Sequence, residues 1–187
     1  IGQSGGPTAV INASLYGAVK AFRESGADGH VLGMINGIEG FLADHVMDLS
    51  TDLSDKELEL LKLTPAAYLG SCRYKLPADL DSEVYPAIFD NFREMNIGYF
   101  LYVGGNDSMD TVDKLSRYAE KIGSDVKFIG IPKTIDNDLV LTDHTPGFGS
   151  AAKYVAASVC EIGLDASVYN TKSVTIIEIM GRHAGWL

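Results

Sequence analysis

The sequence predicts an α/β fold of three layers, in which a mostly parallel, doubly wound sheet lies between two layers of helices. Segments with apolar residues at helical spacing alternate along the chain with short apolar runs. These runs are continuously apolar, which is typical of parallel strands that are buried on both faces. The composition, 46% hydrophobic and 21% charged over 187 residues, is that of a globular chain long enough to bury a sizeable core.

Apolar periodicity predicts five helices. Gly26 ends the first helix, and Ser54 with Glu57 forms a capping box that opens the second, with Pro65 just beyond its end. The expected helices cover residues 8–24, 54–63, 85–95, 107–122 and 150–162. We interpret the charge-rich segment 44–62, which contains the second helix, as a solvated excursion.

Four apolar runs predict strands. The first, residues 31–35, is closed by Asn36-Gly37, and the second, 97–103, is closed by Gly104-Gly105. The others cover residues 126–131, ended by Pro132, and residues 173–179. A loop signal begins at Gly2, so we expect the chain to start inside a strand that is mostly missing.

Charge and cysteine usage narrow the function. The 15 Lys+Arg against 25 Asp+Glu give a formal charge of −10, which argues against a general nucleic-acid or anionic-membrane binder. A small anionic ligand is compatible with this charge because it responds to the local field. No apolar run reaches the ~18 residues of a transmembrane helix. Cys72 and Cys160 are far apart, so we expect both thiols to pack as small hydrophobes in a reducing, cytoplasmic compartment.

Four polar loops follow predicted strands, and three of them contain glycine. They are residues 2–7 (GQSGGP), 104–108 (GGNDS), 132–138 (PKTIDND) and 180–182 (MGR). Open α/β sheets bind ligands outside the carboxyl ends of their strands, so we expect these loops to converge on a site.

The first two loops place glycines before a helix N-terminus. Gly5 and Gly6 in the first loop, and Gly105 in the second, let backbone N–H groups approach an anion that the helix dipole favours. Ser108 adds a hydroxyl for a phosphate oxygen. Ordinary strand-to-helix turns are the alternative, with Asp107 only a helix N-terminal carboxylate. Neither a Walker A loop nor a GxGxxG fingerprint is present.

The third loop carries the sharpest chemistry. Lys133 offers a point charge for phosphate, and Thr134 offers a hydroxyl. Asp136 and Asp138 supply carboxylates, of which one could accept a proton while the other helps to hold Mg²⁺. An Asx-rich turn is the alternative.

Two arginines add candidate phosphate contacts. Arg182 ends the fourth loop, and Arg73 lies in the segment Gly-Ser-Cys-Arg, residues 70–73. The alternative for each is an arginine that caps a surface turn.

Taken together, GGP before a small-residue helix, Gly-Ser-Cys-Arg, GGNDS, PKTIDND and MGR resemble the phosphofructokinase family, more closely its pyrophosphate-dependent branch. The resemblance covers essentially the whole chain. It implies the family's N-terminal α/β domain and phosphoryl transfer to the 1-hydroxyl of fructose 6-phosphate, which gives fructose 1,6-bisphosphate with Mg²⁺ as the cofactor.

The resemblance also implies roles for individual residues. Asp136 aligns with the general base, with Lys133 and Arg182 as further catalytic residues. The remaining implied substrate contacts are Gly5, Gly6, Arg73, Gly105, Asp107, Ser108, Thr134, Asp138, Met180 and Gly181. Asp107 and Asp136 are the expected metal ligands. Asn106 departs from the family, which usually has an aspartate associated with Mg²⁺ at this position.

Three positions bear on the phosphoryl donor. The ATP-dependent branch has glycine where this chain has Asp107 and Lys133, and its adenine-stacking tyrosine falls near Ile38. A carboxylate at position 107 would crowd and repel a nucleotide's α-phosphate, whereas an ammonium at position 133 could bind pyrophosphate directly. The resemblance therefore implies pyrophosphate as the donor, with fructose 6-phosphate as the acceptor.

The extent of the chain qualifies this expectation. The family's chain continues into a second domain that holds the sugar phosphate, so we expect residues 1–187 to be a single donor-binding and catalytic domain with weak or no turnover alone. The resemblance suggests a homodimer or homotetramer.

Three alternative functions remain open: an ATP-dependent phosphofructokinase, a more distant kinase of NAD or a lipid, and a silent phosphosugar-binding or regulatory subunit. Asn106 favours the silent subunit.

Overall fold

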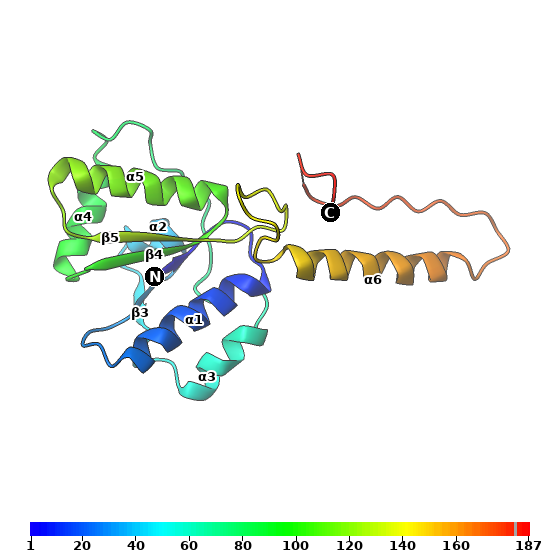
Figure 1. Ribbon diagram of the computed structural model, residues 1–187, viewed down its shortest axis with the longest axis horizontal. Helices are drawn as coiled ribbons and strands as arrows, with labels where there is room; N and C mark the ends of the chain where they lie inside the picture. Colours follow the sequence, from blue (N-terminus) through cyan, green and yellow to red (C-terminus); the bar gives the residue numbers. More distant parts are fainter. Residues whose placement is uncertain (182) are drawn as a thin grey trace. The chain divides into compact units, whose positions relative to one another are not determined.

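The computed structural model describes residues 1–181 and 183–187 (Figure 1). It divides the chain into two compact units, Ile1–Pro132 and Lys133–Leu187, which we call the N-terminal and C-terminal units. The sequence pattern predicts a single domain over 1–187 and gives no sign of this division. Each unit is described below by itself.

The N-terminal unit contains a five-stranded sheet. Its strands are β1 (Gly2–Gln3), β2 (Leu32–Met34), β3 (Val46–Asp48), β4 (Tyr99–Gly104) and β5 (Lys127–Pro132). They lie in the order β3-β2-β1-β4-β5, and every neighbouring pair is parallel except β2 and β3. The predicted mostly parallel sheet is confirmed. Because β1, β4 and β5 run in the same direction, their carboxyl ends meet at one edge.

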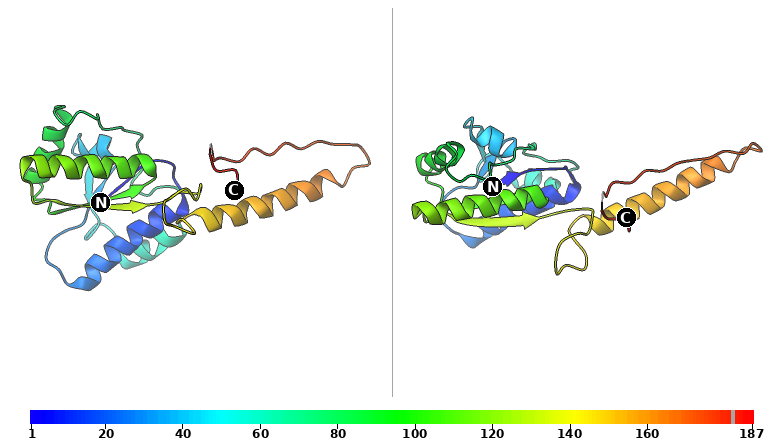
Figure 2. Two further views of the ribbon diagram at one scale, coloured as in Figure 1. Left: turned by 45° about the horizontal axis from the view of Figure 1, so that its top comes forward. Right: turned by 90° about the horizontal axis from the view of Figure 1, so that it is seen from above.

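Helices cover both faces of this sheet, as the doubly wound prediction requires (Figures 1 and 2). The helix α1 (Ala9–Ser25), α3 (Asp55–Leu60) and the 3-10 turn η1 (Leu61–Leu63) lie on one face. The other face carries α2 (Gly37–Phe41), α4 (Val84–Glu94) and α5 (Asn106–Ile122). Each face has its own hydrophobic cluster, the larger one built mainly from aromatic rings of α4, β4 and β5.

Most elements predicted for this unit are confirmed. The helices expected at 8–24, 85–95 and 107–122 form within one or two residues of those bounds, as do the strands at 31–35, 97–103 and 126–131. The helix expected at 54–63 forms as α3 continued by η1. Its capping box is present: the Ser54 hydroxyl accepts from the Glu57 amide, and the Glu57 carboxylate accepts from the Ser54 amide at 2.9 Å.

The interpretation of segment 44–62 as a solvated excursion is wrong. Four of its leucines are buried in the cluster beside α1, namely Leu49, Leu53, Leu58 and Leu61. The segment also contains β3, which was not predicted, and α2 just before it was missed as well. Three-residue and five-residue elements are too short to show a period, and here the charged residues between the leucines masked the buried face.

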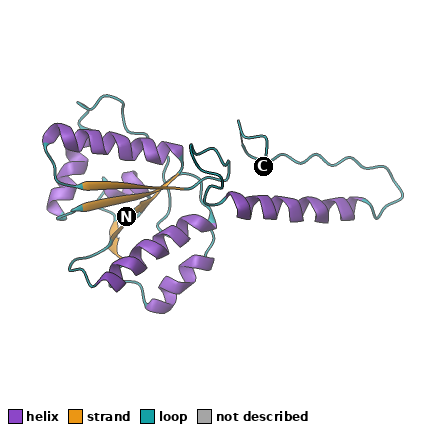
Figure 3. Ribbon diagram, in the orientation of Figure 1, coloured by secondary structure: helices purple, strands orange, loops and turns teal. Residues whose placement is uncertain are grey.

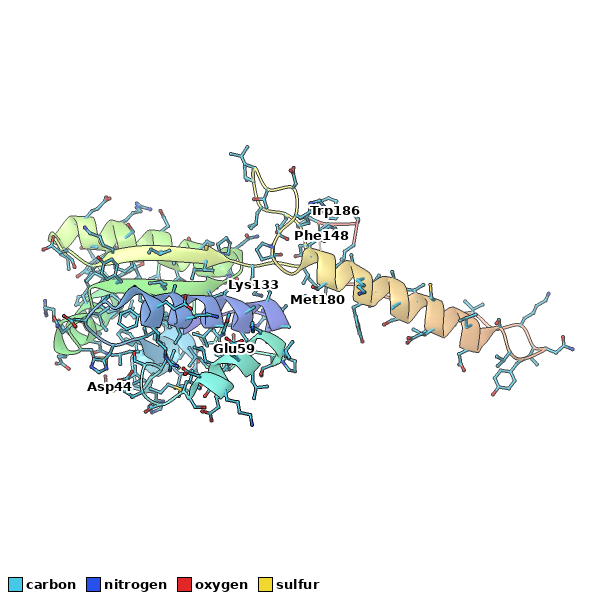
Figure 4. All side chains as sticks on the ribbon, turned by 60° about the horizontal axis from the view of Figure 1, so that its bottom comes forward. Asp44, Glu59, Lys133, Phe148, Met180 and Trp186 are labelled. Carbon is cyan, nitrogen blue, oxygen red and sulfur yellow. The ribbon has the colours of Figure 1, made fainter. Side chains whose placement is uncertain are left out.

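The described residues of the C-terminal unit form the helix α6 (Phe148–Ala166), which confirms the helix expected at 150–162. No residue of α6 is buried, and Figure 4 shows side chains standing out along its whole length. Cys160 is accordingly exposed, whereas Cys72 is buried, so the packing role predicted for both thiols holds only for Cys72. Among the described residues, no helix is both long enough and apolar enough to cross a membrane.

The strand predicted at residues 173–179 is wrong. This segment has no strand pairing and is drawn as a loop in Figure 3. Val174 and Ile176 are each 90% exposed. A strand exists only when a neighbour satisfies its backbone groups, and the described part of the C-terminal unit offers this segment no such neighbour.

Candidate active site

The loop after β1 is joined to the segment that precedes Arg73. The Gly5 amide donates to the Cys72 carbonyl at 3.2 Å, and the Ser71 hydroxyl donates to the Gly5 carbonyl at 2.6 Å. Gly5 has a φ of 79°, a conformation that favours glycine. These contacts place the exposed Arg73 beside the first glycine loop, as the prediction of a shared site requires.

The loop after β4 lies against the same segment. The Ser4 amide donates to the Val103 carbonyl at 3.0 Å. A Cβ on Gly104 would stand only 2.9 Å from the Ser4 carbonyl oxygen and 2.0 Å from the Ser108 hydroxyl, so this close approach requires glycine. The loops after β1 and β4 are therefore neighbours within the N-terminal unit, as predicted.

The start of α5 follows directly from this contact. Gly105 is the N-cap in an extended conformation, and the first-turn N–H groups of a helix lack intrahelical acceptors, which makes this end a site for an anion. Ser108 is only 2% exposed. Its hydroxyl lies against Gly104. An anion at this turn would therefore meet the backbone N–H groups more readily than the Ser108 side chain that was predicted to donate.

Asp107, in the first turn of α5, has a partner that the sequence did not indicate. Its carboxylate lies 3.2 Å from the ammonium of Lys75, and both side chains are about three-quarters exposed. Lys75 follows Arg73 by two residues, but no motif or spacing marked it as part of the site. The ion pair was invisible in the sequence because it depends on how segment 70–76 runs past α5.

A buried amide pair holds this part of the unit together. Gln3 and Asn12 are fully buried, and the Gln3 amide donates to the Asn12 side-chain oxygen at 2.9 Å. Asn12 donates to the Thr64 carbonyl and accepts from the Tyr68 amide, while the Leu69 amide donates to Gln3. The pair fixes the backbone at 64–69, just before the segment that carries Arg73. Both residues were missed in the sequence because their neutral amides have neither a charge nor a nucleophilic group that would mark a site.

The loop that follows β5 belongs to the C-terminal unit and is ordered by its own side chains. The Thr134 hydroxyl accepts from the Asp136 amide at 3.0 Å, and the Thr145 hydroxyl donates to the Thr134 carbonyl at 2.7 Å. Asn137 spans the loop by accepting from the Thr145 amide and donating to the Asp143 carbonyl. The Asx-turn alternative thus describes the local geometry around Asn137, while it leaves Asp136 unexplained.

Asp136 is the residue that this loop leaves unsatisfied. Its Oδ1 atom is buried and has no hydrogen-bond partner. The Trp186 indole N–H donates to the Asp136 backbone carbonyl at 2.9 Å, so the main chain is fixed while the carboxylate oxygen is not engaged. A buried carboxylate oxygen without a partner is costly, and such a group marks a position where a proton donor or a cation binds.

The other predicted site residues of the C-terminal unit differ in their exposure to solvent. Lys133 is 6% exposed, Thr134 is half-buried and Asp138 is exposed. Met180 is 74% exposed, and Gly181 has a φ of 127°. Arg182 lies outside the described residues. The strand predicted just before Met180 is not formed.

A metal-binding cluster is not assembled by the described residues, which contain no group of three His, Cys, Asp or Glu side chains suited to an ion. Asp136 has the unengaged oxygen that a Mg²⁺ ligand needs. Asp107 is already paired with Lys75 and fits that role less well. The two carboxylates predicted to share the metal also lie in different units.

The N-terminal unit is thus an α/β domain that presents glycine loops and a helix N-terminus at one sheet edge, an arrangement able to receive an anion. The family model described as Phosphofructokinase matches residues 1–187. The chain therefore belongs to the phosphofructokinase family, and the predicted family is confirmed.

Known relatives refine this assignment. The chain is 47% identical over 190 residues to the pyrophosphate--fructose 6-phosphate 1-phosphotransferase of Halomonas elongata, covering 99% of this chain and 45% of the relative. It is 40% identical to the sulfofructose kinase of Alkalicoccus urumqiensis, covering all of this chain and 47% of that protein. The solved pyrophosphate-dependent phosphofructokinase of Nitrosospira multiformis matches with a TM-score of 0.90 and 43% identity over 99% of this chain and 46% of that one. The chain spans less than half the length of these relatives.

Proposed function

We propose that the protein transfers a phosphoryl group from pyrophosphate to the 1-hydroxyl of fructose 6-phosphate. The observation that carries the choice of donor is the carboxylate of Asp107 in the first turn of α5, where the ATP-dependent branch has a glycine. This carboxylate repels the α-phosphate that a nucleotide would place there, whereas pyrophosphate has no such group. Relatives whose names specify pyrophosphate, at 44–47% identity, support the proposal.

The residues divide the work between binding and proton transfer. Backbone N–H groups of the glycine loops and of the first turn of α5, together with Arg73, hold the donor phosphates. Lys133 contributes an ammonium. Asp136 accepts the proton of the sugar hydroxyl through its unengaged Oδ1 atom as the oxygen attacks the terminal phosphorus. The bond to the bridging oxygen then breaks, and inorganic phosphate leaves. Positioning and charge neutralisation supply most of the catalysis in such a transfer.

Mg²⁺ would be held by the two predicted ligands, Asp107 and Asp136, the latter through the carboxylate oxygen that does not accept the proton. When bound, it would neutralise charge on the transferring phosphoryl group. Thr134 and Asp138 would orient the sugar, with Met180, Gly181 and Arg182 as the predicted sugar-phosphate contacts. The proposal includes a homodimer or homotetramer in the cytoplasm.

The first test compares donors and acceptors. Formation of the phosphorylated sugar is measured with fructose 6-phosphate and either pyrophosphate or ATP, and with sulfofructose as the alternative acceptor. We expect turnover with pyrophosphate and fructose 6-phosphate only, at a low rate if residues 1–187 are assayed alone. Comparable rates with ATP would contradict the proposal, as would full pyrophosphate use after Asp107→Gly and Lys133→Gly.

The second test separates an enzyme from a silent binding subunit, which Asn106 keeps as the alternative. Asp136→Ala should lower turnover by at least 100-fold, a typical contribution of a general base, while calorimetry still detects fructose 6-phosphate binding. Asp143→Ala is the matched control, because it removes an exposed carboxylate from the same loop. A parent protein that binds both substrates without turnover would support the binding subunit instead.

A further inference from the structure

Segment 70–76 carries Lys75 past the N-terminus of α5 on a fixed path. Cys72 is buried, and its carbonyl accepts from the Gly5 amide. Leu76 is also buried, and its carbonyl accepts from the Lys114 ammonium at 3.0 Å. Lys75 lies between these two anchors, so its backbone has little freedom to move away from the loop that carries Asp107.

The ion pair between Lys75 and Asp107 has little value for stability. The two groups are 3.2 Å apart, but their side chains are 73% and 75% exposed, and exposed ion pairs contribute little to folding. Asp107 already lies in the first turn of α5, where a carboxylate is favoured by the helix without a lysine partner. The pair therefore needs an explanation other than folding.

The local charge provides one. Asp107 places a negative charge at the helix end that the proposed donor, a multiply charged anion, must approach. Repulsion between like charges across a binding site costs affinity and rejects wrong ligands. Pyrophosphate would suffer from this repulsion as a nucleotide does, unless a cation offsets the carboxylate. The cation 3.2 Å away is Lys75.

We propose that Lys75 is a positioning residue for the pyrophosphate donor, which acts by offsetting the charge of Asp107 so that pyrophosphate binds beside it. This inference rests on the proposed function. Asp107 then excludes the nucleotide by the volume of its side chain, while Lys75 keeps the field at the helix end acceptable for the smaller anion. Because Lys75 acts through Asp107, its effect depends on the carboxylate being present.

The test measures the dissociation constant for pyrophosphate, with Mg²⁺ present, by titration calorimetry at low ionic strength. Lys75→Gln should weaken binding about five- to tenfold, and Lys75→Arg should stay within about twofold of the parent, since guanidinium also pairs with a carboxylate. In an Asp107→Asn background, Lys75→Gln should cost less than twofold. Lys121→Gln is the matched control, because Lys121 pairs with Asp81 at the other end of α5.

The outcomes separate this inference from the proposed function. A parent protein that does not bind pyrophosphate would overturn the proposed donor itself. If the parent binds but Lys75→Gln has the affinity of the Lys121→Gln control, the role of Lys75 is refuted. An equal loss with aspartate or asparagine at position 107 also refutes it, because Lys75 would then act independently of the carboxylate. High salt should shrink the effect, since the pair is exposed.

Discussion

The same apolar patterns were used to predict helices and strands in both units, but the predictions held fully only in the N-terminal unit. In the N-terminal unit, each helix and strand predicted from the pattern is present and packs on one of two hydrophobic clusters. In the C-terminal unit, α6 forms but buries no residue, and the strand expected at 173–179 is absent. Both units contain apolar segments with helix and strand patterns. They differ in whether another segment packs against those patterns.

The difference shows that helix and strand signals do not depend equally on their surroundings. A helix satisfies its backbone hydrogen bonds internally, so α6 can form on an exposed segment. A strand obtains its hydrogen bonds from a neighbour, so an apolar run such as 173–179 predicts a strand only if another segment pairs with it. Val174 and Ile176 are exposed, which shows that the apolar pattern favours a strand but does not say which segment will pair with it.

The largest expected effect contrasts a core residue with an exposed one. Phe92 is 2% exposed and contacts four other aromatic rings at centroid distances of 5.2–6.0 Å. Phe92→Ala should lower the free energy of unfolding by about 3–5 kcal/mol, because it leaves a cavity among these rings. Ile176→Ala should stay within about 0.5 kcal/mol of the parent. Urea denaturation measures both, and similar losses would mean that segment 173–179 is packed in solution.

The same contrast explains how much of the site could be predicted. The glycine loops after β1 and β4 and the carboxylate Asp136 could be singled out from the sequence, because glycines before a helix, and a Lys-Thr pair before carboxylates, are local patterns. Lys75, Gln3 and Asn12 were missed, because their roles arise from contacts between segments more than 30 residues apart or from burial. The strand predicted at 173–179, from which the position of Met180 and Gly181 was inferred, did not form, so that inference lost its basis.

A second prediction compares the same side chain in the two units. Asn12→Ala removes the partner of the Thr64 carbonyl and the Tyr68 amide in a buried setting, which should cost about 2–3 kcal/mol. Hydrogen exchange should also accelerate at the Tyr68 amide and, through the loosened segment, at Gly5. Asn137→Gly removes two similar hydrogen bonds from the C-terminal unit and keeps the positive φ of 52° accessible. It should change global unfolding by less than about 0.5 kcal/mol. Equal costs would argue against separate units.

The smallest expected effect tests whether surface contacts of the N-terminal unit also contribute to its folding stability. This contribution depends on pH. Hydrogen bonds from Lys62 and then from Tyr16 lower the pKa of Glu59 from its usual 4.5 to about 2. A carboxyl whose pKa is depressed by folding stabilises the protein above pH 4.5, and this contribution is lost as the pH falls from 4.5 towards 2. Glu59→Gln should therefore lower the urea midpoint slightly at pH 6, with the difference from the parent shrinking through that range. Glu24→Gln removes the same charge from α1. If it reproduced this pH dependence, net surface charge rather than the contacts of Glu59 would be the cause.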